Sequence, residues 1–182
     1  MEELLAWFAK GGGEVSPQVL IEERAGAGVS IVARGPDGVA VGETIVRVPL
    51  SLCLSVETCR RSPALAPIFE AFPDVLQYPA EVLAIALMHG ATRPEQSDWA
   101  VFVDSLPKAV NAMIFWSDQE LAELSDTMAF HMTKMLQRQL ATDWENIHAP
   151  IKAEFPSELG QISYARYSWG APASVAIPIA AH

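Results

Sequence analysis

The 182-residue sequence has few cysteines, no long apolar run and a shortage of basic residues. Its two cysteines, Cys53 and Cys59, cannot make a disulfide framework for a chain of this length, which favours a reducing compartment. Every apolar run is far shorter than the roughly 20 residues that span a bilayer. The N-terminus has two acids before a brief apolar patch, unlike a secretory signal or a transit peptide. We therefore expect an intracellular, cytoplasmic protein without a membrane partner.

Basic residues are outnumbered by acidic ones. The chain has 12 Lys and Arg against 22 Asp and Glu, which gives a formal net charge of −10. A protein that binds along phosphates needs a basic surface, so we expect no nucleic-acid partner. Apolar residues make up 51% of the chain, enough for a sizeable core. The length indicates one domain, or one domain with an appended segment.

Motifs for metal binding and nucleophilic catalysis are also missing. None of the four histidines pairs with another His or Cys at metal-ligand spacing, and no Cys-x-x-Cys or His-Glu-x-x-His occurs. No Gly-x-Ser-x-Gly motif indicates a serine hydrolase. Cys53 is expected to act as a small core hydrophobe rather than a nucleophile. We therefore assign no metal ligand and no catalytic residue.

Strand patterns are confined to the front of the chain. Val29, Ile31 and Ala33 alternate with other residues and give one apolar face with a period of two. A second β-branched run follows at 44–48, and a Gly-Pro-Asp-Gly turn at 35–38 lies between the two. These patterns predict two short strands joined by a turn-rich loop.

Helical patterns occupy most of the remaining chain. Residues 1–10 predict a short amphipathic helix, which the three glycines at 11–13 end in a flexible turn rather than a phosphate loop. Residues 81–89 predict a buried helix with Gly90 as its C-terminal cap. Residues 98–106 predict another helix, which ends before a proline.

The longest helical pattern runs over residues 117–148. It starts with a capping box, in which Ser117 accepts a hydrogen bond from the third amide and Glu120 reaches back to the serine amide. A break is expected near Asp126. Apolar residues recur further on at three- and four-residue spacing: Met128, Met132, Met135, Leu136 and Leu140. We expect this stripe to pack in the core, and an adaptable methionine-lined binding groove is the alternative.

A glycine pair precedes the first predicted strand. In Ala25-Gly26-Ala27-Gly28-Val29 the glycines let a ligand or another backbone approach closely, with amides free to donate. There is no G-x-G-x-x-G motif, and the glycines precede a strand rather than a helix, which argues against a dinucleotide fold. A ligand site and a plain structural turn both remain open here.

Together these segments resemble the Rubisco large-subunit methyltransferase-like branch of the SET-domain protein-lysine methyltransferases. Residues 26–55, GAGVSIVARGPDGVAVGETIVRVPLSLCLS, are similar to the opening β unit of that branch. Residues 81–90, 99–107 and 115–121 are similar to the helical insert that divides its SET domain. Residues 164–175, YARYSWGAPASV, resemble the helix where the chain returns toward the second SET half.

The resemblance implies transfer of a methyl group from S-adenosyl-L-methionine to a lysine of a protein substrate. Such an in-line displacement requires that the reactants are held in alignment. In the family, backbone groups of the glycine-containing turn hold part of the cofactor, which by position falls on Gly26, Ala27, Gly28 and Val29. The family's Asn-His pair and its channel tyrosine belong to the second SET half, and no Asn-His dipeptide occurs in this sequence.

The expected fold class is therefore α+β, with a small N-terminal β unit of a SET domain followed by a mainly helical insert, an incomplete SET fold. We expect an N-terminal helix and Gly-rich turn at 1–18, the first β part at 19–60, the helical insert at 61–170 and a divergent short tail at 171–182. With half of the site missing, a truncated form with little or no activity is expected. The alternative is a non-catalytic protein-interaction module that uses the helical insert.

Overall fold

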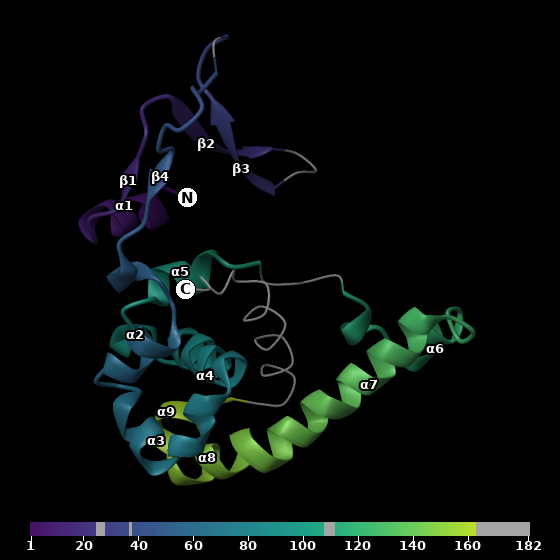
Figure 1. Cartoon of the computed structure of the whole chain (residues 1–182). Helices are drawn as coiled ribbons and strands as arrows, with labels where there is room; N and C mark the ends of the chain where they lie inside the picture. The colour runs from purple at the N-terminus through teal and green to yellow at the C-terminus, as the bar shows by residue number, and fades with distance from the viewer. Residues whose placement is uncertain (25–27, 37, 108–111, 163–182) are drawn as a thin grey trace. The chain divides into compact units, whose positions relative to one another are not determined.

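The computed structural model describes residues 1–24, 28–36, 38–107 and 112–162. The chain divides into two compact units, Met1–Cys53 and Leu54–His182, here the first and second units. All strands of the described residues lie in the first unit, and helices build the described part of the second (Figure 1). The predicted α+β fold class is confirmed. The segment 164–175 and the tail 171–182 lie outside the described residues.

The first unit combines one helix with four short strands. Its elements are α1 (Glu2–Lys10), β1 (Glu14–Val15), β2 (Val19–Arg24), β3 (Gly28–Ala33), β4 (Val46–Arg47) and the 3-10 turn η1 (Leu50–Leu52). β1 pairs with β4, and β2 pairs with β3, both antiparallel. The two strands predicted at the front of the chain are β3 and β4, and each is paired with a different partner. The second of them is shorter than the predicted run at 44–48.

Tight packing surrounds the glycine run after α1. Gly12 has a φ of +86°, which favours glycine. A Cβ on Gly11 would collide with the side chain of Leu52, and one on Gly13 would collide with the ring of Phe8. The predicted turn after this helix is confirmed. It is a packed turn, because glycines leave room for two large apolar side chains.

Little of the first unit is buried. Val19, at 5% exposure, is the single buried apolar residue among its described positions. On β3, the apolar face predicted from the sequence is open, with Val29 at 58% and Ile31 at 50% exposure. Two-stranded sheets also leave edges on both sides. The described residues of this unit therefore have almost no core of their own.

The second unit is built around helix α4. Its elements are α2 (Val56–Arg61), α3 (Ala66–Ala71), η2 (Pro73–Gln77), α4 (Pro79–Thr92), η3 (Pro94–Gln96), α5 (Ala100–Ser105), η4 (Met113–Phe115), α6 (Asp118–Ala122), α7 (Met128–Asp143), the π-helical turn η5 (Trp144–His148), α8 (Ala149–Glu154) and α9 (Pro156–Leu159). Val82, Ile85 and Leu87 on α4 are 0% exposed. Val82 and Ile85 pack in one core cluster with Cys59 of α2 and Ile151 of α8. None of the described helices combines the length and hydropathy required to cross a bilayer.

Gly90 lies inside α4 and does not cap it, because the helix continues to Thr92. A Cβ on Gly90 would lie 3.0 Å from Ser97 Oγ and 3.0 Å from Val103 Cγ2. The glycine therefore allows the neighbouring segment and α5 to pack closely against α4. The predicted cap is wrong because glycine serves packing here rather than a left-handed turn.

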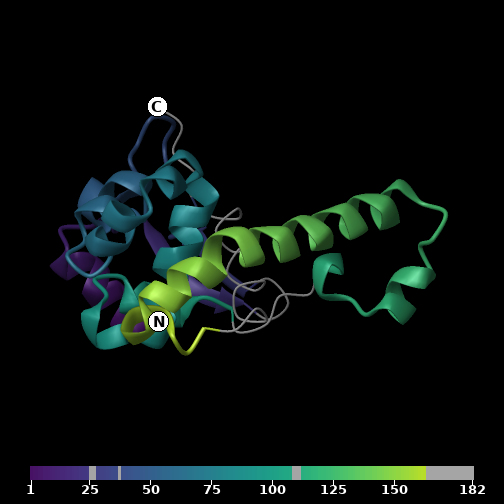
Figure 2. The ribbon, with the colours of Figure 1, turned by 90° about the horizontal axis from the view of Figure 1, so that it is seen from below.

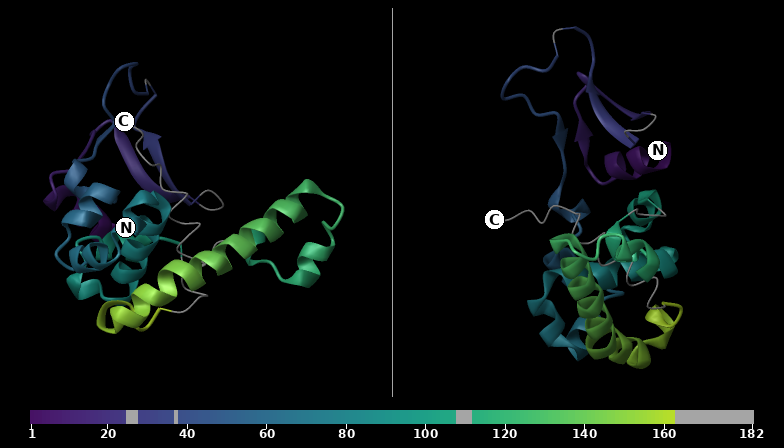
Figure 3. Two further views of the ribbon diagram at one scale, coloured as in Figure 1. Left: turned by 60° about the horizontal axis from the view of Figure 1, so that its bottom comes forward. Right: turned by 90° about the vertical axis from the view of Figure 1, so that its right-hand side faces the viewer.

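The predicted capping box and helix break are both present. Ser117 Oγ accepts from the Glu120 amide at 3.3 Å, and Glu120 Oε2 accepts from the Ser117 amide at 2.7 Å. The backbone and hydroxyl of Ser117 both donate to this carboxylate and lower the pKa of Glu120. α6 ends at Ala122 and α7 begins at Met128. Within the second unit, α7 extends away from α4 and α8, with α6 beside its far end (Figures 2 and 3).

The methionine stripe on α7 is exposed, contrary to the core packing expected from the sequence. Its members Met128, Met132, Met135 and Leu136 are 73%, 57%, 64% and 49% exposed, and Leu140 is buried. The periodicity correctly identifies an apolar face. It does not determine whether another part of the chain covers that face.

Candidate functional site

The β2–β3 hairpin carries the turn that the sequence proposes as a ligand site. Its register runs from Val19 opposite Ala33 to Arg24 opposite Gly28. Gly26 and Ala27 lie outside the described residues. Gly28 is the first residue of β3, and Val29 follows it opposite Glu23. The structure therefore places two of the four predicted residues at the end of the β2–β3 pair, at the start of β3.

Charged side chains gather at this end of the hairpin. Arg24 Nε lies 2.7 Å from Glu22 Oε1, and both side chains are about half exposed, at 52% and 42%. Glu23 is exposed on the opposite face of β2. Val29 is exposed beside these charged side chains, so this end of the strand pair presents both apolar and polar groups to solvent. Such an edge can contact a polar ligand.

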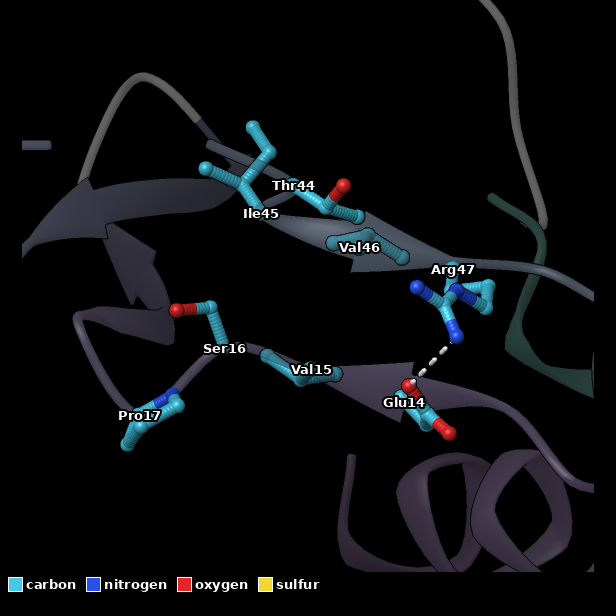
Figure 4. A pocket seen from close by; sticks show the side chains of 8 residues that line it. All are labelled: Glu14, Val15, Ser16, Pro17, Thr44, Ile45, Val46 and Arg47. Carbon is cyan, nitrogen blue, oxygen red and sulfur yellow. Dashed lines mark ion pairs between the residues drawn. The ribbon is translucent and has the colours of Figure 1, made fainter. Parts of the chain in front are cut away.

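A cavity of about 260 Å³ lies elsewhere in the first unit, along β1 and β4 (Figure 4). It is lined by Glu14, Val15, Ser16, Pro17, Thr44, Ile45, Val46 and Arg47. Arg47 Nη1 and Glu14 Oε2 form an ion pair of 3.5 Å across the two strands. The Ser16 amide donates to the Ile45 carbonyl at 2.9 Å. Sequence reasoning missed this cavity, because only its β4 side had a strand signal.

A second cavity of about 270 Å³ lies in the second unit between η2 and η5. Phe72, Asp74, Tyr78 and Asn146 are among its lining residues. Phe72 also packs edge-on against Phe155, with 6.4 Å between ring centroids. Neither of these two cavities includes Gly28 or Val29. The hairpin end and the cavities are therefore separate features.

Two histidines of the second unit are buried. His89 is 1% exposed, and its Nε2 has no hydrogen-bond partner among the described residues. Burial lowers the pKa of His89 below its ordinary value of 6.5. His148 is 3% exposed and faces Glu81. Among the described residues, no group of three or more His, Cys, Asp or Glu side chains is placed to hold a metal ion.

The two cysteines are free and differ in burial. Cys59 is 0% exposed, and burial raises its pKa to about 12. Such a thiol stays protonated and behaves as a core side chain. Cys53 is half-buried, with Sγ 3.6 Å from the Pro49 carbonyl oxygen. Of the two, only Cys59 is a full member of the core.

Comparison of the fold with solved structures identifies a SET domain. The chain is similar to Rubisco LSMT bound to sinefungin and monomethyllysine, with a TM-score of 0.71 at 19% identity. It is similar to the SET domain of LSMT bound to MeLysine and AdoHcy, with a TM-score of 0.72 at 18% identity. Each match covers 93% of this chain and 38% of the other. The fold is therefore that of part of a SET domain.

Comparison of the sequence leads to the same branch, although no protein-family model matches it. The chain is 27% identical over 136 residues to the chloroplastic [fructose-bisphosphate aldolase]-lysine N-methyltransferase of Arabidopsis thaliana. It is 22% identical over 124 residues to the chloroplastic ribulose-1,5 bisphosphate carboxylase/oxygenase large subunit N-methyltransferase of Nicotiana tabacum. These matches cover 72% and 68% of this chain but 26% and 23% of the relatives, so the chain spans about a quarter of their length. The resemblance to Rubisco LSMT-like SET-domain proteins is confirmed.

Proposed function

We propose that the chain is part of an S-adenosyl-L-methionine-dependent protein-lysine N-methyltransferase. This proposal rests on one observation: the sequence comparison and the fold comparison both lead to the same group of methyltransferases. Both relatives are N-methyltransferases of proteins, one of them named for lysine, and they align over more than two thirds of this chain. The solved SET domains with the same fold hold sinefungin or AdoHcy together with lysine or a methylated lysine.

We assign Gly26, Ala27, Gly28 and Val29 to the cofactor. Gly28 adds no side chain at the start of β3, and Val29 is 58% exposed, so ligand atoms could approach this backbone. The described residues fit the cofactor in part, since they supply an exposed strand edge at Val29, and neither of the two described cavities includes Gly28 or Val29. The cofactor supplies an electrophilic methyl group, and the protein's task is to align it with a neutral lysine amine.

The proposed substrate is a lysine-bearing protein segment. The chain's net charge of −10 supports a basic segment, because acidic surfaces attract lysine-rich ones. The absence of a nucleic-acid partner stays a prediction from the same charge. An intracellular location also stays a prediction, supported by two free cysteines, while the names of both relatives give a chloroplast location.

We further propose that these 182 residues alone transfer methyl groups slowly or not at all. The sequence has no Asn-His dipeptide, and its described tyrosine, Tyr78, lines a cavity of the second unit far along the chain from the hairpin. Catalysis by positioning is lost steeply when part of the alignment is missing. We therefore expect the chain to bind the cofactor even if it does not transfer the methyl group.

Equilibrium dialysis with radiolabelled S-adenosylmethionine tests the cofactor assignment. The 182-residue chain is expected to show saturable binding, and Gly28→Leu should weaken it by at least about tenfold, or 1.4 kcal/mol. Ala33→Leu is the matched control, because it adds the same side-chain type at the exposed far end of β3. Failure of the unaltered chain to bind would overturn the assignment, as would equal weakening by both variants.

Radiolabel transfer tests the expected lack of turnover. The chain is incubated with labelled cofactor and either Rubisco or fructose-bisphosphate aldolase, the substrates named for the two relatives. We expect cofactor binding without label on either protein. Transfer to a lysine of either protein would support the methyltransferase proposal and refute the expected loss of activity.

A further inference from the structure

Helix α7 turns its apolar side away from the described rest of its unit. Thr133 is buried, Lys134 pairs with Asp118, and Gln137 Nε2 donates to the Ile114 carbonyl at 2.9 Å. This polar side therefore faces η4 and α6. On the opposite side lie the exposed Met128, Met132, Met135 and Leu136. An amphipathic helix normally buries its apolar face, so the covering surface for this one is missing from the described chain.

The exposed face has the spacing of a coiled-coil seam. Met128, Met132, Met135 and Gln139 follow one another at intervals of four, three and four residues, the alternation of a and d positions. His131 and Arg138 then fall at the flanking g positions, and both are exposed. The seam is about 17 Å long at 1.5 Å per residue. This geometry fits a second helix better than a flat surface or a small molecule.

The charge of the seam is opposite to that of the whole chain. Residues 128–142 contain no carboxylate, although the chain has 22. Arg138 makes no ion pair with the described residues. A complementary helix would therefore place Glu or Asp beside its own apolar positions.

A second copy of this chain fits the seam less well. Antiparallel pairing of two α7 helices brings the g positions of both copies together, so Arg138 and His131 face like residues. Parallel pairing sets Arg138 against Asp143, but it brings together two copies that each carry a net charge of −10.

We propose that α7 between Met128 and Gln139 is a docking seam for an amphipathic helix of another protein with acidic flanking residues. The long, unbranched methionine side chains can adjust to the partner's apolar residues. The carboxylates of the partner helix pair with Arg138, which makes no ion pair with the described residues. This interaction is independent of methyl transfer and does not require the cofactor.

Fluorescence anisotropy with two designed peptides tests the seam. Both labelled peptides carry leucine at the a and d positions, and one has Glu and the other Lys at the e and g positions. The 182-residue chain should bind the Glu peptide at least about tenfold more tightly, and salt should weaken this binding. Non-specific attraction to a chain of net charge −10 predicts the opposite preference.

Exposed-site variants locate the binding. Met132→Gln with Met135→Gln should weaken binding of the Glu peptide by at least about tenfold, and Arg138→Glu should shift the preference toward the Lys peptide. Val41→Gln with Leu50→Gln is the matched control, because these side chains are 107% and 70% exposed in the first unit. Circular dichroism should show unchanged folding for all variants, since each altered side chain is exposed.

Three outcomes would overturn the proposal. The first is equal or tighter binding of the Lys peptide. The second is the same loss of binding in the seam and control variants. The third is self-association of the chain, measured by sedimentation, that the Met132→Gln and Met135→Gln pair abolishes, with no binding of the Glu peptide. That last result would make a second copy the occupant.

Discussion

The imidazole of His148 lies against the carboxylate of Glu81, with 2.5 Å between Nε2 and Oε2. Glu81 belongs to the first turn of α4, and His148 ends the π-helical turn after α7. The two side chains are 14% and 2% exposed. Trp144 stacks on the imidazole, with 6.2 Å between ring centroids. This pair therefore attaches the π turn to the central helix of the second unit.

Glu81→Leu should destabilise the chain, because it removes the carboxylate that faces a buried imidazole. We expect the free energy of unfolding to fall by about 2–4 kcal/mol, and His148→Leu should have a similar effect. The double variant should cost clearly less than the two single losses together, since neither polar partner then remains. Urea unfolding followed by circular dichroism measures all three. Single losses under about 0.5 kcal/mol would show that the pair contributes little.

Acid should destabilise the chain through His89. Burial keeps the pKa of this histidine below its ordinary 6.5, and Arg93 adds to that effect against Glu158 and Glu95. As pH falls below about 6.5, protons bind the unfolded chain before the folded one, so the stability present above that pH is lost. Urea unfolding between about pH 5 and 8 should show this decline.

Two variants separate His89 from other acid-sensitive groups. His89→Leu should flatten the decline in the free energy of unfolding, because the buried titrating group is gone. His131→Gln is the control, since His131 is exposed on α7. An unchanged slope in His89→Leu would show that other groups cause the acid sensitivity.

The two cysteines should react with iodoacetamide at different rates. Cys59 is fully buried with a pKa of about 12, so its thiolate is scarce and inaccessible in the folded chain. Cys53 is half-buried and should be alkylated first. Peptide mass spectrometry over time should show label on Cys59 only as the second unit unfolds, and urea should accelerate it. Equal rates in the native chain would contradict the burial of Cys59.

Gly90→Val should destabilise the contact between α4 and α5. The new side chain would meet Ser97 and Val103, which already lie 3.0 Å from an added Cβ. We expect a loss of about 1–3 kcal/mol in the free energy of unfolding. Ala91→Val is the matched control for the helix propensity of valine, because Ala91 is only half-buried in the same helix. Equal losses would show that close packing at Gly90 is unimportant.

Local signals in the sequence were sufficient for several elements. The capping box at Ser117 and the break before α7 depend on neighbouring residues, and both are present. The continuous apolar run in α4 likewise predicted a buried helix. In contrast, the pairing of β1 with β4 and the contact of Glu81 with His148 join distant segments. No local pattern carries that information.

The features proposed for function also divide into those that local sequence predicts and those that it does not. A strand after the glycine pair was predictable, and the structure places Gly28 and Val29 at the start of that strand, β3. Which way an apolar face points was not predictable, since periodicity gives the same signal for covered and uncovered faces. Met132 and Met135 were expected inside and are outside. Gly90 was misread because a cap and a close helix contact both select glycine.

The near absence of buried residues in the first unit has a consequence for any ligand of the hairpin. With Val19 as the single buried apolar residue among its described positions, this unit has little internal packing to hold β2 and β3 in place. A ligand that recognises the ordered strands must select them from looser arrangements, and its apparent dissociation constant rises as the ordered fraction falls. The affinity measured for a ligand of the hairpin would then depend on how often β2 and β3 are ordered as much as on the contacts that the ligand makes with them.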